Sequence, residues 1–373
     1  MENFDDIRPY YDSEIPAAMS RIAVSEAFPL ISTWIYPNRN LEEIREMVRG
    51  FKKIQDFQFE VMVQVNRQVI ERTMTDFSYS GLENIAVDKP YLYVSNHRDI
   101  MLDASLLQYI LFKLGRDTSE ITFGANLMSP GLVTDIGKSN KMFRVERAGS
   151  GNIRDFYVKS KHLSDYIRHA VVDLQHSVWI AQRNGRTKDG NDKTDQGIIK
   201  MFGMSLPEDK IKGLSDLHIL PVSISYEWES CDILKAIELY ESRHGKYIKK
   251  PGEDLTSILT GITQPKGKVH IAFCKEITEV ELRKYENCTC NEFHKKVAQL
   301  LDERIHAAYV LTPNNYIAHD LRYGQTKYVE YYTEEQKQIF LNYMSQLEKY
   351  DTAETDVLRD IFLGIYANPV DNK

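Results

Sequence analysis

The chain has 373 residues, of which 42% are hydrophobic and 27% are charged, so it can form one large domain or two ordinary ones around a sizeable core. Its formal net charge of −7 argues against a nucleic-acid-binding protein, because such proteins usually carry a basic face. No segment approaches the roughly 20 apolar residues of a membrane-spanning helix, and the acidic N-terminus is not typical of a secretory signal. The four cysteines match neither a disulfide framework nor a zinc pattern, which favours the reducing cytoplasm.

The first 76 residues are predicted to be helical. Apolar residues recur at steps of three and four from Leu41 to Val69, which predicts an amphipathic helix of unusual length over residues 41–74. Such helices can form a layer on the core or a docking face for a bilayer or a hydrophobic partner. The candidates for a docking face lie close together in sequence: Phe28, Leu30, Ile31, Trp34, Ile35 and Tyr36.

The middle of the chain alternates short apolar runs with helical patterns. Helical patterns occupy residues 102–115 and 153–176. Alternation of this kind predicts an α/β fold with a largely parallel sheet flanked by helices. The expected strands are residues 91–97, 121–127, 141–147, 177–183, 218–227 and 268–274.

The pattern becomes helical again from about Cys290, and no Gly-, Ser- or Pro-rich linker interrupts the chain. We therefore expect one α/β core with helical additions at both ends. The predicted divisions are an N-terminal helical region (1–76), the α/β core (77–285) and a C-terminal helical extension (286–373).

A polar cluster follows the first expected strand of the core. His97 stands at its end, and Asp103 opens the next helical pattern. Loops at strand ends are where α/β sheets place their chemistry, and an imidazole can accept a proton near neutral pH. A carboxylate on the other ring nitrogen would fix the tautomer, and either Asp103 or Asp99 could supply it. The alternative is that these polar residues only cap the turn and the helix.

Two further strand ends carry basic residues next to glycine. Arg144 and Arg147 precede one glycine-bearing turn. A second turn has Arg183, Arg186 and Lys188 around Gly185. Glycine lets backbone amides approach a ligand, and arginine gives bidentate contacts to phosphate, so the two loops together predict an anion site.

The blocks "NHRDIMLD", "FRVER", "NGRTKDG" and "LPVSISYE" resemble, in order, the four sequence blocks of the glycerol-3-phosphate and lysophosphatidate acyltransferases. The resemblance covers about residues 77–280 and implies that His97 is the general base and Asp103 its partner. It also implies that Arg147, Gly185 and Arg186 bind the acceptor's phosphate. Pro221 and Tyr226 match the fourth block, which is linked to the acyl side and to packing.

The chain departs from the family pattern at two positions. Five residues separate His97 from Asp103 where the family has four, and Asn184 stands where the family usually has glutamate. One added residue turns a helical side chain by about 100°, so the loop must absorb it or Asp99 takes the role. The loss of a charge at Asn184 bears on the identity of the acceptor.

The reaction that the resemblance implies is transfer of a fatty acyl group from acyl-carrier protein or a coenzyme A thioester to a hydroxyl of glycerol-3-phosphate or 1-acylglycerol-3-phosphate, as in phospholipid synthesis. His97 would take the hydroxyl proton, and neither a metal nor another cofactor is implied. An aminolipid or other lipid acceptor is the first alternative. A catalytically silent lipid- or carrier-binding protein is the second. The expected location is cytoplasmic, with possible peripheral contact at the inner face of the membrane.

Overall fold

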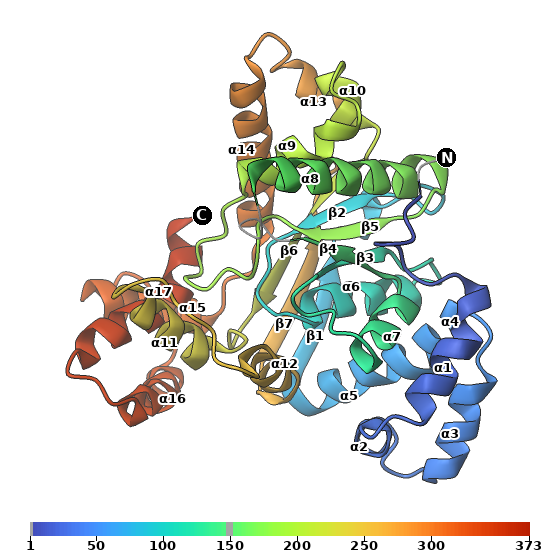
Figure 1. Ribbon diagram of the computed structural model, residues 1–373. Coiled ribbons are helices and arrows are strands. Elements are labelled where there is room, and N and C mark those ends of the chain that lie inside the picture. The colour runs from blue at the N-terminus through green and yellow to red at the C-terminus, as the bar shows by residue number, and fades with distance from the viewer. Residues whose placement is uncertain (1–2, 147–151) are drawn as a thin grey trace.

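A central sheet organises the computed structural model, which describes residues 3–146 and 152–373 (Figure 1). Six of its strands lie where the sequence predicts them. Strand β1 was not predicted: it begins at Met74, inside the N-terminal stretch predicted to be helical, and continues to Ser80. The described strands are β1 (Met74–Ser80), β2 (Leu92–Ser95), β3 (Glu120–Gly124), β4 (Met142–Val145), β5 (Val178–Ala181), β6 (Ile219–Tyr226) and β7 (Gly267–Phe273).

The strand order is β1-β7-β6-β2-β5-β3-β4, and every neighbouring pair is parallel except β6 and β7. This confirms the predicted mixed, largely parallel sheet. Strands β2, β5 and β6 are buried along their whole length, as expected where helices cover both faces of a parallel sheet. Because β2, β5 and β6 are parallel neighbours, their carboxyl ends meet at one edge of the sheet.

Helices cover the two faces of the sheet in separate layers (Figure 1). Two hydrophobic clusters, one on each face, contain alternate residues of the same strands, for example Leu92 and Tyr93 of β2. One layer holds α8 (Ile153–Arg168), α9 (Gln196–Phe202), α10 (Lys210–Ser215), α13 (Glu279–Arg283) and α14 (Cys290–Ala308), and the other holds α5 (Val63–Thr73), α6 (Leu102–Lys113), α7 (Leu132–Ser139) and α12 (Glu253–Thr263).

The long helix predicted over residues 41–74 is wrong. The chain forms α3 (Leu41–Gly50), α4 (Ile54–Phe57), a π-helical turn and then α5. The first break falls after Gly50, a poor helix former, where Phe51 adopts an extended conformation and is buried. With α1 (Ile15–Ala23) and α2 (Phe28–Ile35), the short helices enclose their own hydrophobic cluster, which one straight helix could not do.

The C-terminal helices form a fourth cluster beside the sheet. Helix α11 (Asp232–Ser242) packs there against α17 (Thr355–Asp371), which also contacts α15 (Pro313–Tyr323). Helix α16 (Glu334–Met344) closes this cluster. Helix α14 instead packs on the sheet, although the predicted boundary at residue 286 places it in the extension. Within the described residues, we find no helix of sufficient length and apolarity to cross a bilayer.

Candidate active site

The loop that carries His97 is held in place by the two strands beside β2. The side chain of Asn96 accepts from the backbone N–H of Ile224 (2.8 Å) and donates to the carbonyl of Ile224 (2.9 Å), so it extends the pairing of β2 with β6 by one residue. On the other side, the N–H of Thr187 donates to the carbonyl of His97 (2.7 Å). The position of His97 is thus set by hydrogen bonds to both neighbouring segments.

Asp103 lies against the imidazole of His97. Its Oδ2 is 2.8 Å from Nδ1 of His97 and also accepts from the backbone N–H groups of Arg98 (2.5 Å) and Asp99 (2.9 Å). The loop therefore curls around this carboxylate at the start of α6, and this accommodates the additional residue in the His–Asp spacing. A carboxylate that only accepts makes Nδ1 the donor and leaves Nε2 to act as a base.

Asp99 does not contact His97. Its Oδ1 accepts from the N–H groups of Met101 and Leu102, both at 2.8 Å, and so caps α6. Its Oδ2 accepts from the hydroxyl of Ser230. Of the two carboxylates that the sequence left open, the structure brings only Asp103 to the imidazole.

Tyr226 also belongs to the hydrogen-bonded group around His97 and Asp103, which the sequence did not predict. Its hydroxyl, at the end of β6, donates to Oδ1 of Asp103 (2.8 Å). Burial and the nearby charge of Asp103 raise the pKa of Tyr226 well above its ordinary value, so the hydroxyl stays protonated and remains a donor. The resemblance linked Tyr226 to packing and the acyl side, whereas here it holds the carboxylate that orients His97. Pro221 is buried earlier in β6, opposite Val94.

A cavity of about 1000 Å³ opens in front of His97. The indole of Trp179 stands edge-on to the imidazole, with 5.6 Å between the ring centroids. Much of the remaining wall is apolar and is formed by strand ends and by helices α8 and α9. These apolar residues include Phe123, Leu127, Leu163, Ile180, Met201 and Met204. The cavity thus joins a polar end at His97 to a surface suited to an acyl chain.

The loop after β5 forms the basic wall of the same cavity. Gly185 has a φ of +75°, a conformation that favours glycine, and it lines the cavity together with Arg183, Arg186 and Lys188. Arg186 Nη1 is buried without a hydrogen-bond partner in the described part of the chain, while Lys188 is paired with Glu238. Arg186 is therefore the cation of this loop best placed to bind an anion.

The other predicted basic loop, after β4, contributes less to the cavity wall than the loop after β5 does. Arg144 does not line the cavity, because its side chain projects from the face of β4 opposite to that of Phe143 and Val145, and it pairs with Glu146 (2.8 Å). The structure thus gives no support to the expectation that Arg144 joins the anion site, which stays a prediction. Arg147 lies outside the described residues.

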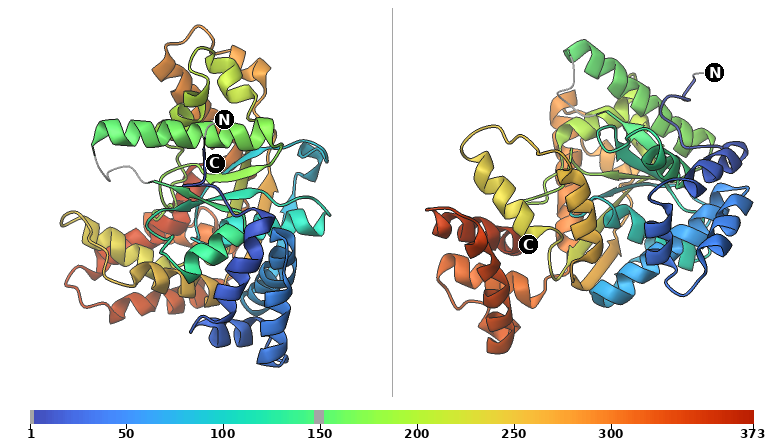
Figure 2. Two further views of the ribbon diagram at one scale, coloured as in Figure 1. Left: turned by 45° about the vertical axis from the view of Figure 1, so that its right-hand side comes forward. Right: turned by 60° about the horizontal axis from the view of Figure 1, so that its bottom comes forward.

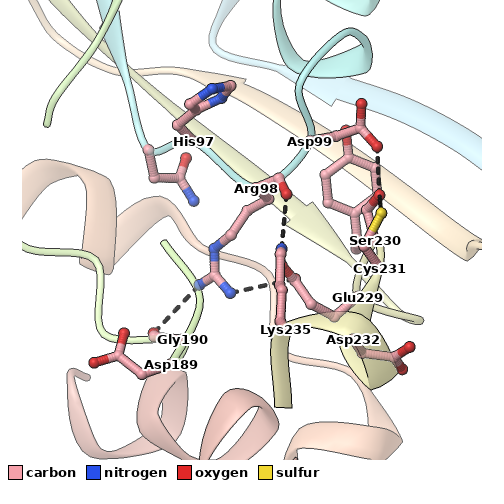
Figure 3. A network of polar contacts seen from close by, with 12 residues as sticks. His97, Arg98, Asp99, Asp189, Gly190, Glu229, Ser230, Cys231, Asp232 and Lys235 are labelled. Carbon is pink, nitrogen blue, oxygen red and sulfur yellow. Dashed lines mark hydrogen bonds and ion pairs between the residues drawn. The ribbon is translucent and has the colours of Figure 1, made fainter. Parts of the chain in front are cut away.

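Behind His97, away from the cavity, Arg98 enters a network of buried charges (Figure 3). Its guanidinium contacts Asp192 (2.5 Å), Glu229 (3.2 Å) and the carbonyl of Gly190 (3.3 Å). Lys235 completes the network, since its ammonium pairs with Glu229 (2.5 Å) and donates to the carbonyl of Arg98 (2.7 Å). The network ties the loops after β2, β5 and β6 to α11, and nothing in the sequence pattern pointed to it.

The described residues hold no group of three or more His, Cys, Asp or Glu side chains arranged to bind a metal ion. The arrangement can nevertheless perform acid–base chemistry, since an oriented imidazole faces a cavity with one basic and one apolar wall. Proton abstraction from a bound hydroxyl needs a base of this kind within hydrogen-bond reach.

Comparison with known proteins defines the class. Residues 76–225, which contain His97, Asp103 and the loop after β5, match the model of the family described as Acyltransferase. The match covers the part of the chain in which the sequence predicted the acyltransferase core, so the chain contains an acyltransferase domain and the protein is an acyltransferase.

Among solved structures, a 1-acyl-sn-glycerophosphate acyltransferase from Thermotoga maritima is 14% identical and aligns over 78% of this chain and 94% of its own, with a TM-score of 0.35. No conclusion about substrate follows from a likeness this distant. None of the curated proteins compared with the chain matches it.

Proposed function

We propose that the protein transfers a fatty acyl group from an acyl thioester, carried by acyl-carrier protein or coenzyme A, to a hydroxyl of glycerol-3-phosphate or 1-acylglycerol-3-phosphate. The observation that carries the proposal is the position of His97, whose Nδ1 is held by Asp103 at the inner end of a cavity with a basic and an apolar wall. Such a product would be a precursor of phospholipids.

His97 acts as the general base. Its Nδ1–H donates to Asp103, and its Nε2 takes the proton of the acceptor hydroxyl as the oxygen attacks the thioester carbonyl. The tetrahedral intermediate then collapses, the carbon–sulfur bond breaks, and the thiol leaves with a proton. The hydroxyl oxygen reaches the carbonyl directly, so no acyl-enzyme is formed. Tyr226 and the two backbone N–H groups keep Asp103 in place throughout.

Arg186 binds the phosphate of the acceptor. Its buried Nη1 has no partner within the described residues, and a phosphate oxygen would satisfy it. A free cation beside an oriented base suits an acceptor that carries a phosphate close to its reacting hydroxyl. The apolar wall formed by α8, α9 and the strand ends receives the acyl chain of the donor.

Release of free thiol from acyl thioesters tests the proposal directly. Glycerol-3-phosphate, 1-acylglycerol-3-phosphate and an aminolipid precursor would be offered in turn, with acyl-carrier protein and coenzyme A as alternative carriers. We expect turnover with one of the two phosphate-bearing acceptors and a loss of about 10²–10⁴-fold in kcat for His97→Ala, whose fold should be intact by circular dichroism. Turnover with the aminolipid precursor alone, or a His97→Ala protein of full activity, would reject it.

A further inference from the structure

Exposed apolar side chains surround the opening of the cavity. Ile153 and Tyr157, in the first turns of α8, line the cavity and yet are 91% and 57% exposed. Across the opening, Lys249 lines the cavity and its neighbour Ile248 is 82% exposed. Residues that line a cavity and face solvent mark its mouth, so we call residues 152–160 and 243–254 the mouth rim. Both views of Figure 2 place the beginning of α8 near the segment that leads into α12.

The mouth rim is also basic. It contains six lysine or arginine residues against three aspartate or glutamate residues, in a chain of net charge −7. Lys249 is paired with Asp254, and Lys159 lies 3.7 Å from Glu146. For Lys246 and Lys250 no ion pair is found within residues 3–146 and 152–373, and both are exposed. The rim therefore combines projecting apolar side chains with positive charge, which is the combination that binds anionic bilayer surfaces.

We propose that the mouth rim docks on an anionic lipid bilayer, so that Ile153 and Ile248 insert among the lipids and the cavity opens towards the membrane. The inference rests on the proposed function, because a lipid acceptor or product would then pass between bilayer and cavity without crossing water. Scattered surface hydrophobics need no explanation, but a group of them around the entrance of a cavity marks an interaction site.

The N-terminal candidates fit a bilayer less well. Phe28 and Ile35 are buried in the cluster of α1–α4, and Trp34 is partly covered and lies under Arg72. Leu30 remains 77% exposed, yet no residue of α2 lines the cavity. The part of the docking expectation that rested on Phe28 and Ile35 is therefore wrong.

Flotation of the full chain with vesicles tests the docking surface without requiring turnover. The unaltered protein should float with vesicles of phosphatidylcholine and phosphatidylglycerol. The variant Ile153→Ser/Ile248→Ser should bind at least tenfold more weakly, because two apolar side chains lose their burial. The matched control Leu30→Ser/Ile31→Ser should bind as the unaltered protein does.

Charge is tested by Lys246→Gln/Lys250→Gln. This variant should bind anionic vesicles roughly 30-fold more weakly but bind neutral phosphatidylcholine vesicles without change, since each of the two lysines contributes about 1 kcal/mol only near an anionic surface. If the α2 control loses binding and the rim variants keep it, the N-terminal face docks instead. If the rim variants float normally but lose transfer from acyl-carrier protein alone, the rim binds an acidic protein and the proposal falls.

A soluble assay separates this inference from the proposed function. Ile248→Ser, whose side chain does not line the cavity, should transfer a short acyl group from coenzyme A to glycerol-3-phosphate at the unaltered rate. If the protein floats but transfers no acyl group, the docking inference stands and the proposed function is rejected. If the protein transfers acyl groups but does not float, only the docking inference is rejected.

Discussion

Two arginine-bearing regions lie on opposite sides of His97 and differ in how their charges are compensated. On the inner side, Arg98 is buried and meets Asp192 and Glu229, so each charge has a partner. On the cavity side, Arg183 and Arg186 form no ion pair within the described residues. A buried charge without a partner is costly, so removing one member of the compensated region should destabilise the fold, whereas the uncompensated region is available to a ligand.

The pKa of Arg98 shows how the charges of the inner region compensate one another. Burial alone would lower it, but the negative charges of Asp192 and Glu229 raise it above its ordinary value, so the guanidinium remains charged. The same contacts hold the loops after β2, β5 and β6 together around His97. We therefore expect changes on the inner side to affect stability and changes on the cavity side to affect kinetics.

The largest effect is expected for Arg98→Met. Removing the cation leaves Asp192 buried without its partner, which typically costs about 3–5 kcal/mol. Urea unfolding should show this loss in the free energy of unfolding. Adding Asp192→Asn should recover part of it, because the second change removes the unpaired charge. An Arg98→Met protein as stable as the unaltered one would contradict the structural role of the network.

Asp103→Asn tests how His97, which lies between the inner side and the cavity side, is oriented as the base. We expect kcat to fall by well over tenfold but by less than in His97→Ala, because a neutral amide orients the imidazole less firmly and cannot stabilise the imidazolium that forms when Nε2 takes the proton. Steady-state thiol release measures it.

Asp99→Asn is the matched control, since Asp99 caps α6 and does not touch His97. Its kcat should stay within a few-fold of the unaltered value. A severe loss of kcat in Asp99→Asn with a mild one in Asp103→Asn would show that the wrong carboxylate has been assigned to His97.

The sequence predicted the sheet better than it predicted the site. Six strands were evident because they are short apolar runs bounded by polar residues, whereas β1, with a half-exposed pattern on an edge strand, was not. His97 and Asp103 were found because they are close in sequence. Tyr226 and Asp192 reach the site from more than 90 residues away, and contacts of that kind leave no local spacing to detect.

Arg186→Met probes the cavity side. The KM for the phosphate-bearing acceptor should rise by roughly 10–100-fold, since a hydrogen bond to a charged group contributes about 1.5–3 kcal/mol, while the KM for the acyl donor stays the same. Stability should change little, because no partner of Arg186 is left uncompensated. Lys188→Met is the matched control and should raise this KM less, as Lys188 already pairs with Glu238. A larger rise in the acceptor KM for Lys188→Met than for Arg186→Met would assign phosphate binding to Lys188.

Arg144→Gln should have the smallest effect. Its guanidinium is 2.8 Å from Glu146, but the side chain is about half exposed, and surface pairs of this kind contribute about 0–1 kcal/mol. It does not line the cavity, so kcat and both KM values should remain within twofold of those of the unaltered protein. A rise in the acceptor KM comparable to that of Arg186→Met would mean that the end of β4 reaches the bound phosphate. The anion site would then extend over both basic loops, as their glycine- and arginine-bearing sequences first indicated.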